Sequence, residues 1–220
     1  MDNLPSLISA GVNDFLTMCN IGGTNFTAAC VQGILGAHIR KRAEEARIIL
    51  IEEFRKARID KIEWATEDEF AGTLLRYLNA VRDNAARLNL RLMAKVMVGQ
   101  AVHDRLYADD FNRYANSLST LSRKEVVALV NVHMLTVSYG ATPADGFTDP
   151  RMEAMLARVV PSTFKSGDEF VAVCGAISRT GFIISSNDKN IFRFTTTALM
   201  DEICELADFK DALRSEDSNL

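Results

Sequence analysis

Apolar side chains recur every three or four residues between Thr66 and Gly99, the spacing that forms one apolar stripe along a helix. No proline interrupts the pattern, and Arg91 and Lys95 fall on the opposite, polar face. Thr66 and Glu69 have the spacing of a capping box. The pattern therefore predicts one helix of about 50 Å, at 1.5 Å per residue, against which the rest of the chain packs. The stripe consists of Phe70, Leu74, Leu78, Val81, Ala85, Leu88, Leu92 and Val96.

A second helical pattern covers residues 33–64, ahead of that helix. Glutamates and arginines are interleaved along it, which predicts a charged, solvent-exposed face, and Glu52 and Lys56 have the favourable i,i+4 order. The run 48–51 is apolar on every side of a helix, so it predicts contacts on more than one side. Two long helices in succession predict an αα-hairpin.

The first 39 residues are unusually poor in charge. No charged residue occurs from Phe15 to Ile39, and Arg40, Lys41 and Arg42 follow immediately, which is the outline of a membrane span with a basic flank. Polar residues and glycines interrupt the apolar runs, however, so we favour a helix at 12–18, a loop, and a second helix beginning near residue 24. An apolar segment of this size seldom stays exposed. We therefore expect it to be buried or to self-associate, with membrane contact through 15–39 as the alternative. The candidate interaction residues here are Phe15, Phe26, Ile34, Leu35, Arg40 and Arg42.

The second half of the chain contains shorter elements with clear boundary signals. Ser122/Glu125 and Ser166/Glu169 predict capping boxes, and Pro150 predicts the first residue of a helix. Asp109 or Asp110 can cap a short helix before them. Residues 182–185 and 191–194 predict a β-hairpin around a loop at 186–190. A final helix follows, and residues 214–220 resemble a frayed tail.

These elements predict a mainly α protein. We expect a long-helix hairpin or bundle with the apolar N-terminal segment over residues 1–121. A second region, 122–220, holds the β-hairpin.

The passage Ala176–Ile203, AISRTGFIISSNDKNIFRFTTTALMDEI, resembles the end of a winged helix, in which a β-hairpin wing follows the helix-turn-helix. With the phrase 88–94 and Leu121-Ser122, the wider order of elements resembles bacterial helical proteins of the abortive-infection alpha type. The first resemblance implies a winged-helix-like module, and the second implies a bacterial protein connected with phage defence and an effector that acts on membranes.

A winged helix would read DNA with its second helix, here 167–179, and with its wing. Arg179, Lys189 and Arg193 are the candidate contacts. The helix carries two acidic residues, and residues 163–220 contain 6 basic and 10 acidic residues, a net charge of −4. Phosphate binding depends on neutralisation by basic residues. We therefore expect this module to contact protein, with DNA-binding regulator as an alternative.

The sequence contains no recognisable set of catalytic residues. His38, His103 and His133 are isolated, and the four cysteines form no metal-binding or redox pair. No phosphate-binding or nucleophile motif is present. The net charge of −4 and the absence of a signal-peptide pattern favour a cytoplasmic protein that is not a nucleic-acid binder. We therefore expect no enzyme, cofactor or metal. The prediction is an interaction or assembly protein that forms a homo-oligomer or binds a protein partner.

Overall fold

The structure is a computed structural model that describes residues 4–20, 26–60, 67–103, 106–139, 150–188 and 191–217. The described residues form ten α-helices, one short 3-10 helix and one two-stranded sheet, which confirms the predicted mainly α fold with one β-hairpin. The chain divides into two compact units. The first comprises residues 1–120 with Leu206–Asp208, and the second comprises Leu121–Glu205 with 209–220.

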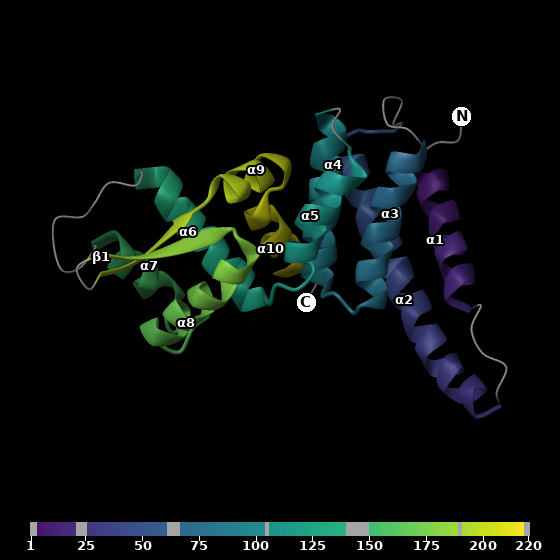
Figure 1. Ribbon diagram of the computed structural model, residues 1–220, viewed down its shortest axis with the longest axis horizontal. Helices are drawn as coiled ribbons and strands as arrows, with labels where there is room; N and C mark the ends of the chain where they lie inside the picture. Colours follow the sequence, from purple (N-terminus) through teal and green to yellow (C-terminus); the bar gives the residue numbers. More distant parts are fainter. Residues whose placement is uncertain are drawn as a thin grey trace. The chain divides into compact units, whose positions relative to one another are not determined.

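The first unit contains five helices (Figure 1). They are α1 (Leu4–Asn20), α2 (Phe26–Lys56), α3 (Glu67–Arg82), α4 (Arg87–Val102) and α5 (Ala108–Leu118). Helix α4 contacts α2, α3 and α5, and its side chains are buried almost continuously from Leu88 to Ala101. The helix α4 is therefore the core element of this unit.

The predicted continuous helix over 66–99 is wrong, because the chain breaks between α3 and α4. Asn84 adopts the left-handed conformation, with φ of 62°. The N–H of Ala85 donates to the Ala80 carbonyl, and the N–H of Asn84 donates to the Val81 carbonyl. These two bonds form a Schellman motif, which ends a helix at a residue that tolerates positive φ. Two helices of about 24 Å each, at 1.5 Å per residue, replace the single long one.

Helix α1 begins earlier than the predicted start near Val12. Its apolar positions Leu4, Ile8, Val12 and Phe15 follow helical spacing and are all buried. The helix contacts α2 and α3 of the same chain. For α1, intramolecular packing therefore accounts for the apolar stripe.

The second unit holds the remaining elements. They are α6 (Arg123–Tyr139), α7 (Pro150–Val159), α8 (Gly167–Ile177), the 3-10 helix η1 (Ser178–Thr180), β1 (Ile183–Asp188), β2 (Ile191–Thr196), α9 (Ala198–Leu206, of which Leu206 is counted with the first unit) and α10 (Phe209–Asp217). Phe164 and Phe170 meet edge to face in its core, with ring centroids 5.2 Å apart. Helix α6 contacts α8, β2 and α10.

Local signals fixed several boundaries in this unit. The predicted capping box at Ser122 is confirmed: the N–H of Glu125 donates to Ser122 Oγ at 3.3 Å, and the N–H of Ser122 donates to Glu125 Oε2 at 2.7 Å. At Ser166 the predicted N-cap forms, because the N–H of Glu169 donates to Ser166 Oγ at 3.2 Å, but the Glu169 carboxylate accepts from the N–H of Lys165 at 2.6 Å and not from that of Ser166. Helix α7 begins at Pro150, as predicted. By contrast, Asp109 and Asp110 do not cap α5. They lie inside its first turn, where carboxylates interact favourably with the positive end of the helix dipole.

Two predicted boundaries near the C-terminus are wrong. The strands β1 and β2 are antiparallel with Asp188 opposite Ile191, so the strands extend into the predicted loop and residues 189–190 alone connect them. Residues 214–217 belong to α10, and Glu216 is buried. Apolar residues earlier in α10, including Phe209 and Ala212, pack in the core and hold this helix in place.

Candidate interaction surface

Helix α2 presents an apolar surface at its first half. Figure 1 shows that the start of α2 extends beyond the ends of α1 and α3. Ile34 is 75% exposed and Leu35 is 55% exposed, and Gly33 and Ala37 are exposed as well. A Cβ atom added to Gly33 would meet no atom within 4 Å. We call residues 33–37 the α2 end surface.

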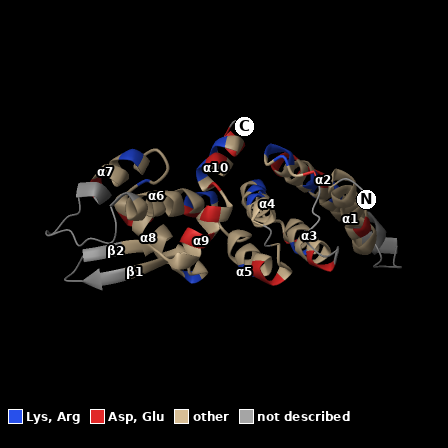
Figure 2. Cartoon of the chain, turned by 90° about the horizontal axis from the view of Figure 1, so that it is seen from above, with Lys and Arg blue, Asp and Glu red and all other residues tan. Residues whose placement is uncertain are grey.

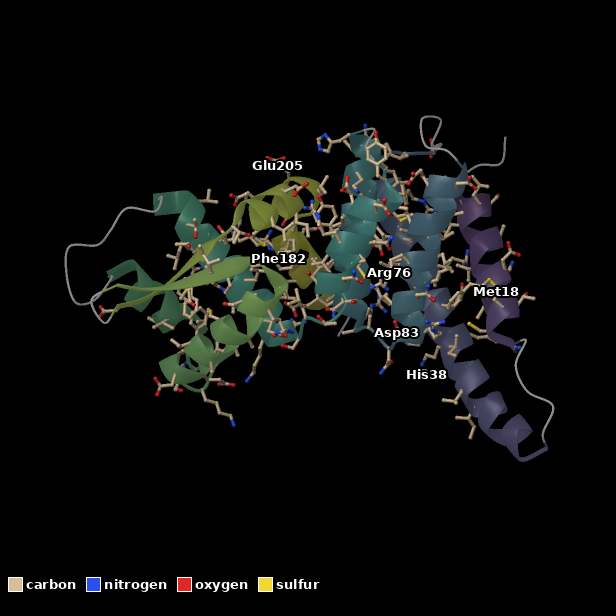
Figure 3. The ribbon with its side chains drawn as sticks, in the orientation of Figure 1. Met18, His38, Arg76, Asp83, Phe182 and Glu205 are labelled. Carbon is tan, nitrogen blue, oxygen red and sulfur yellow. The ribbon has the colours of Figure 1, made fainter. Side chains whose placement is uncertain are left out.

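Further apolar area lies at the same end of the first unit. Met18 of α1 is 62% exposed, and Figure 3 shows Met18 and His38 at this end, with Asp83 of the α3–α4 turn. The side chains of residues 26–32 lie outside the described set, so the α2 end surface is defined here by its described residues alone.

The charge changes abruptly at the base of this surface. Arg40 and Lys41 are exposed, and among the described residues neither makes an ion pair. Arg42 has a structural role instead: its Nη1 donates to Glu45 at 3.0 Å, and its Nη2 donates to the Ala85 carbonyl of the α3–α4 turn. In Figure 2 the basic positions of α2 lie beside acidic ones on the same helix. Among the residues that the structure describes, Arg40 and Lys41 are therefore cations available to a ligand next to the α2 end surface.

A buried ion cluster anchors the second half of α2. The side chain of Glu53 of α2 is 4% exposed and that of Arg91 of α4 is 1% exposed. Arg91 Nη1 lies 2.6 Å from Glu53 Oε1, and Lys95 Nζ lies 3.0 Å from Glu53 Oε2. Removing one partner of a buried ion pair strongly destabilises the fold, because the other charge stays buried without a counter-charge. The cluster therefore fixes α2 against α4.

Neighbouring polar groups extend this anchor. Lys56 Nζ lies 3.0 Å from both Glu52 and Glu53, so the predicted i,i+4 pair Glu52–Lys56 is confirmed. Burial alone would raise the pKa of Glu52, but the hydrogen bonds and charges of Lys56 and Arg91 outweigh it and hold that pKa below its ordinary value. The buried Tyr77 hydroxyl donates to the Ala46 carbonyl at 3.0 Å. Burial raises the pKa of Tyr77, so its hydroxyl stays neutral and remains a donor.

The sequence did not predict this cluster. The apolar stripe places Arg91 and Lys95 on the polar face of α4, but it gives no partner for them. In the structure both residues lie against Glu53. The sequence signal that could have indicated it is the pair of cations at i,i+4 on a helix whose other positions are nearly all apolar.

The predicted interaction residues of the first unit fall into different environments. Phe15 is 4% exposed and packs inside the unit, so the idea that it offers an outward contact is wrong. Phe26 is the first residue of α2, and its side chain lies outside the described residues. Ile34, Leu35 and Arg40 are exposed together at one end of α2.

The predicted DNA contacts are not gathered into one described surface. Arg179 Nη1 donates to Glu125 of α6 and to the Ala176 carbonyl. Burial would raise the pKa of Glu125, but bonds from Arg179 and from the N–H of Ser122 outweigh it and lower that pKa. Lys189 lies outside the described residues, as does the side chain of Arg193 on β2. Arg179 therefore stabilises the start of α6, and DNA contact by the three residues stays a prediction.

The thiols described in the structure are separate from one another. Cys174 is buried on α8, where burial raises the pKa of its thiol to about 12, whereas Cys19 is exposed on α1. Within the described residues, no three His, Cys, Asp or Glu side chains converge on a point that could hold a metal ion. None of the described helices combines the length and the apolar character needed to cross a membrane.

The chain matches no protein-family model, no curated protein and no solved structure. The resemblance to winged helices and to abortive-infection proteins therefore stays a prediction.

Proposed function

We propose that this chain is a non-enzymatic assembly protein that binds another protein chain through the α2 end surface. The observation that carries the proposal is the exposure of Ile34 and Leu35, at 75% and 55%, on a helix segment without any charge. Removing apolar surface from water contributes about 25 cal/mol of favourable free energy per Å². A helix that is apolar on several sides is ordinarily buried, which supports coverage by a partner.

The anchoring of α2 supports the same proposal. The contacts of Glu53 with Arg91 and Lys95 hold the second half of the helix in the first unit. The first half continues from this fixed base as the same helix. Binding then requires little ordering of the backbone, which reduces the entropic cost of association.

We propose further that the second unit is a winged-helix-like module of bacterial origin that contacts protein. The order α6, α7, α8, β1, β2, α9 supports this assignment. The bond of Arg179 to Glu125 and the net charge of −4 over residues 163–220 support protein contact over DNA contact. A salt-sensitive gel shift with duplex DNA would contradict this part of the proposal.

The test of assembly is the molar mass of the full chain, measured by light scattering at micromolar concentration. We expect a mass well above the 24.4 kDa of one chain. Ile34→Glu should reduce the mass to that of the monomer, because the partner would have to bury a carboxylate. Ile48→Glu is the matched control, because Ile48 lies on the same helix and is 53% exposed, but outside the α2 end surface.

Two results would overturn the proposal. One is a wild-type chain that stays at 24.4 kDa at every concentration. The other is an equal loss of mass in Ile34→Glu and Ile48→Glu, which would show that the surface responsible is not the α2 end. Circular dichroism of both variants distinguishes loss of assembly from loss of helix.

A further inference from the structure

We propose that His133 of α6 and Asp201 of α9 form a proton-dependent contact, which holds the start of α9 against α6 when the imidazole is charged. Both residues belong to the second unit, so the contact is independent of the α2 end surface. His133 Nδ1 is buried and has no hydrogen-bond partner among the described residues, and Asp201 Oδ1 lies 3.7 Å from it. A buried polar atom without a partner is uncommon in folded proteins. The carboxylate of Asp201 can satisfy this nitrogen once the nitrogen carries a proton.

Neighbouring hydrogen bonds fix the backbone around this pair. Thr136, one turn after His133 on α6, accepts from the N–H of Thr196 at the end of β2 at 3.4 Å. Thr197 then caps α9, because its Oγ1 accepts a backbone N–H of the first turn of that helix at 3.4 Å. An N–H···O bond measures about 2.7–3.2 Å, so closing the pair requires a shift of roughly 0.5–1 Å. The two side chains are therefore placed for a direct bond between helices whose positions are already fixed.

The charge of the imidazole decides how strong this contact is. A histidine ordinarily becomes cationic as pH falls through about 6.5, whereas an aspartate ordinarily stays ionised above about pH 3.9. The cation offers the carboxylate a charged N–H donor, and hydrogen bonds between charged partners are about twice as strong as those between neutral ones. The stabilisation by the ion pair is thus present below about pH 6.5 and is lost as pH rises above it.

Asp201 is the one carboxylate within 4.0 Å of His133 in the described part of the chain. The ion pairs of Arg123, Lys124 and Glu125 lie at the start of α6. They are about eight residues or more before His133, or about 12 Å along the helix at 1.5 Å per residue, which exceeds the screening length of about 8 Å. The other described carboxylates of α9 and of the elements that pack against α6 are Glu153, Asp168, Glu169, Glu202, Glu205, Asp211, Glu216 and Asp217. The described cations of these elements are Arg158, Lys210 and Arg214.

Hydrogen exchange of the α9 amides, measured by mass spectrometry on the full chain, tests the contact through local opening of the helix. The wild type is compared with Asp201→Asn at pH 5.5 and at pH 8. We expect the ratio of the two exchange rates, variant over wild type, to be about two- to fivefold larger at pH 5.5 than at pH 8, the effect of a partly exposed ion pair. The other charges near His133 are present in both proteins, so their effect cancels in the ratio.

Glu205→Gln is the matched control. Glu205 is exposed on the same helix and loses the same charge, but it is not paired with His133. Its ratio should be equal at the two pH values. Asp201→Asn also removes a carboxylate from the first turn of α9, where the helix dipole favours it. Aspartate is ionised at both pH values, so that loss does not change between them.

Two results would overturn the proposal. One is an Asp201→Asn ratio that is equal at pH 5.5 and pH 8, which would show that the charge of the imidazole plays no part. The other is a rise at pH 5.5 that persists in the background of His133→Gln, which would assign it to another group. If circular dichroism shows that His133→Gln is misfolded, the comparison of Asp201→Asn with Glu205→Gln decides: an equal rise in both variants rejects the contact.

Discussion

Replacing Glu53 by glutamine tests the buried ion cluster that anchors α2. The substitution keeps the size of the side chain and removes the charge that Arg91 contacts at 2.6 Å and Lys95 contacts at 3.0 Å. The side chain of Arg91 is 1% exposed, so it cannot turn its guanidinium toward water without moving neighbouring helices. Removing one partner of a buried pair costs about 3–5 kcal/mol, and we expect Glu53→Gln to lower the free energy of unfolding by that amount.

Glu52→Gln is the matched control for this substitution. Glu52 is the adjacent residue and undergoes the same chemical change, but it is 43% exposed and its contact with Arg91 is 3.4 Å. Half-exposed pairs contribute about 0–1 kcal/mol, so the control should stay within that range. The assay is urea unfolding followed by the fluorescence of Trp64, the single tryptophan, which belongs to the sequence of the first unit.

A double variant measures the coupling between Arg91 and Glu53. Arg91→Met alone leaves Glu53 with Lys95 and Lys56, each at 3.0 Å, so it should cost less than Glu53→Gln. Combined with Glu53→Gln it should cost less than the sum of the two single changes, by about 1–3 kcal/mol, as expected for contacting residues. The cluster would not anchor α2 if Glu53→Gln cost no more than Glu52→Gln, or if the costs of Arg91→Met and Glu53→Gln simply added.

Three further predictions concern local features. Asn84→Gly should leave the free energy of unfolding unchanged or slightly higher, whereas Asn84→Ala should lower it by about 1 kcal/mol, because φ is 62° at this position. In the native chain at pH 8, a water-soluble maleimide should label Cys19 and leave Cys174 unmodified, because the Cys174 thiol is buried and its pKa is about 12; mass spectrometry of tryptic peptides checks this. The pKa of Glu125 is lowered in the folded protein, so its stabilising contribution is present above the ordinary glutamate pKa of about 4.3 and is lost as pH falls through the lower folded value. The difference in unfolding free energy between wild type and Glu125→Gln should therefore shrink below about pH 4.

Local chemistry made several elements predictable from the sequence. Ser122 with Glu125 forms a complete capping box, and Ser166 forms the expected N-cap bond with the N–H of Glu169, because these bonds depend on residues three positions apart. The spacing of apolar residues likewise predicted the mainly helical fold and the β-hairpin. Thr66, the third predicted cap, lies outside the described residues.

The break between α3 and α4 was hidden by the same periodicity that predicted the helix. Val81, Ala85 and Leu88 keep the spacing of one stripe across the break, and all three are buried. Neither glycine nor proline marks the turn, because Asn84 supplies the positive φ. A pattern of apolar residues shows which positions are buried, but it does not show whether the backbone between them stays helical.

The interaction surface was only partly predictable for a related reason. The absence of charge identified both Phe15 and Ile34 as candidates. Phe15 is buried on α1, which packs against α2 and α3, whereas Ile34 on α2 is 75% exposed. Which apolar residue is covered depends on how far each helix extends in space. Arg91 and Lys95 show the reverse case, in which charged residues of a polar helix face contact a carboxylate on a helix distant in the sequence.

The ion cluster also determines the register between α2 and α4. A shift of α2 by one turn, about 5.4 Å, would place Ile49 or Ala57 where Glu53 now meets Arg91, and neither side chain carries a charge. Every neighbouring register would thus enclose a guanidinium without its closest carboxylate. The carboxylate of Glu53 therefore helps to set how far α2 extends, although it lies more than 25 Å along the helix from Ile34, at 1.5 Å per residue.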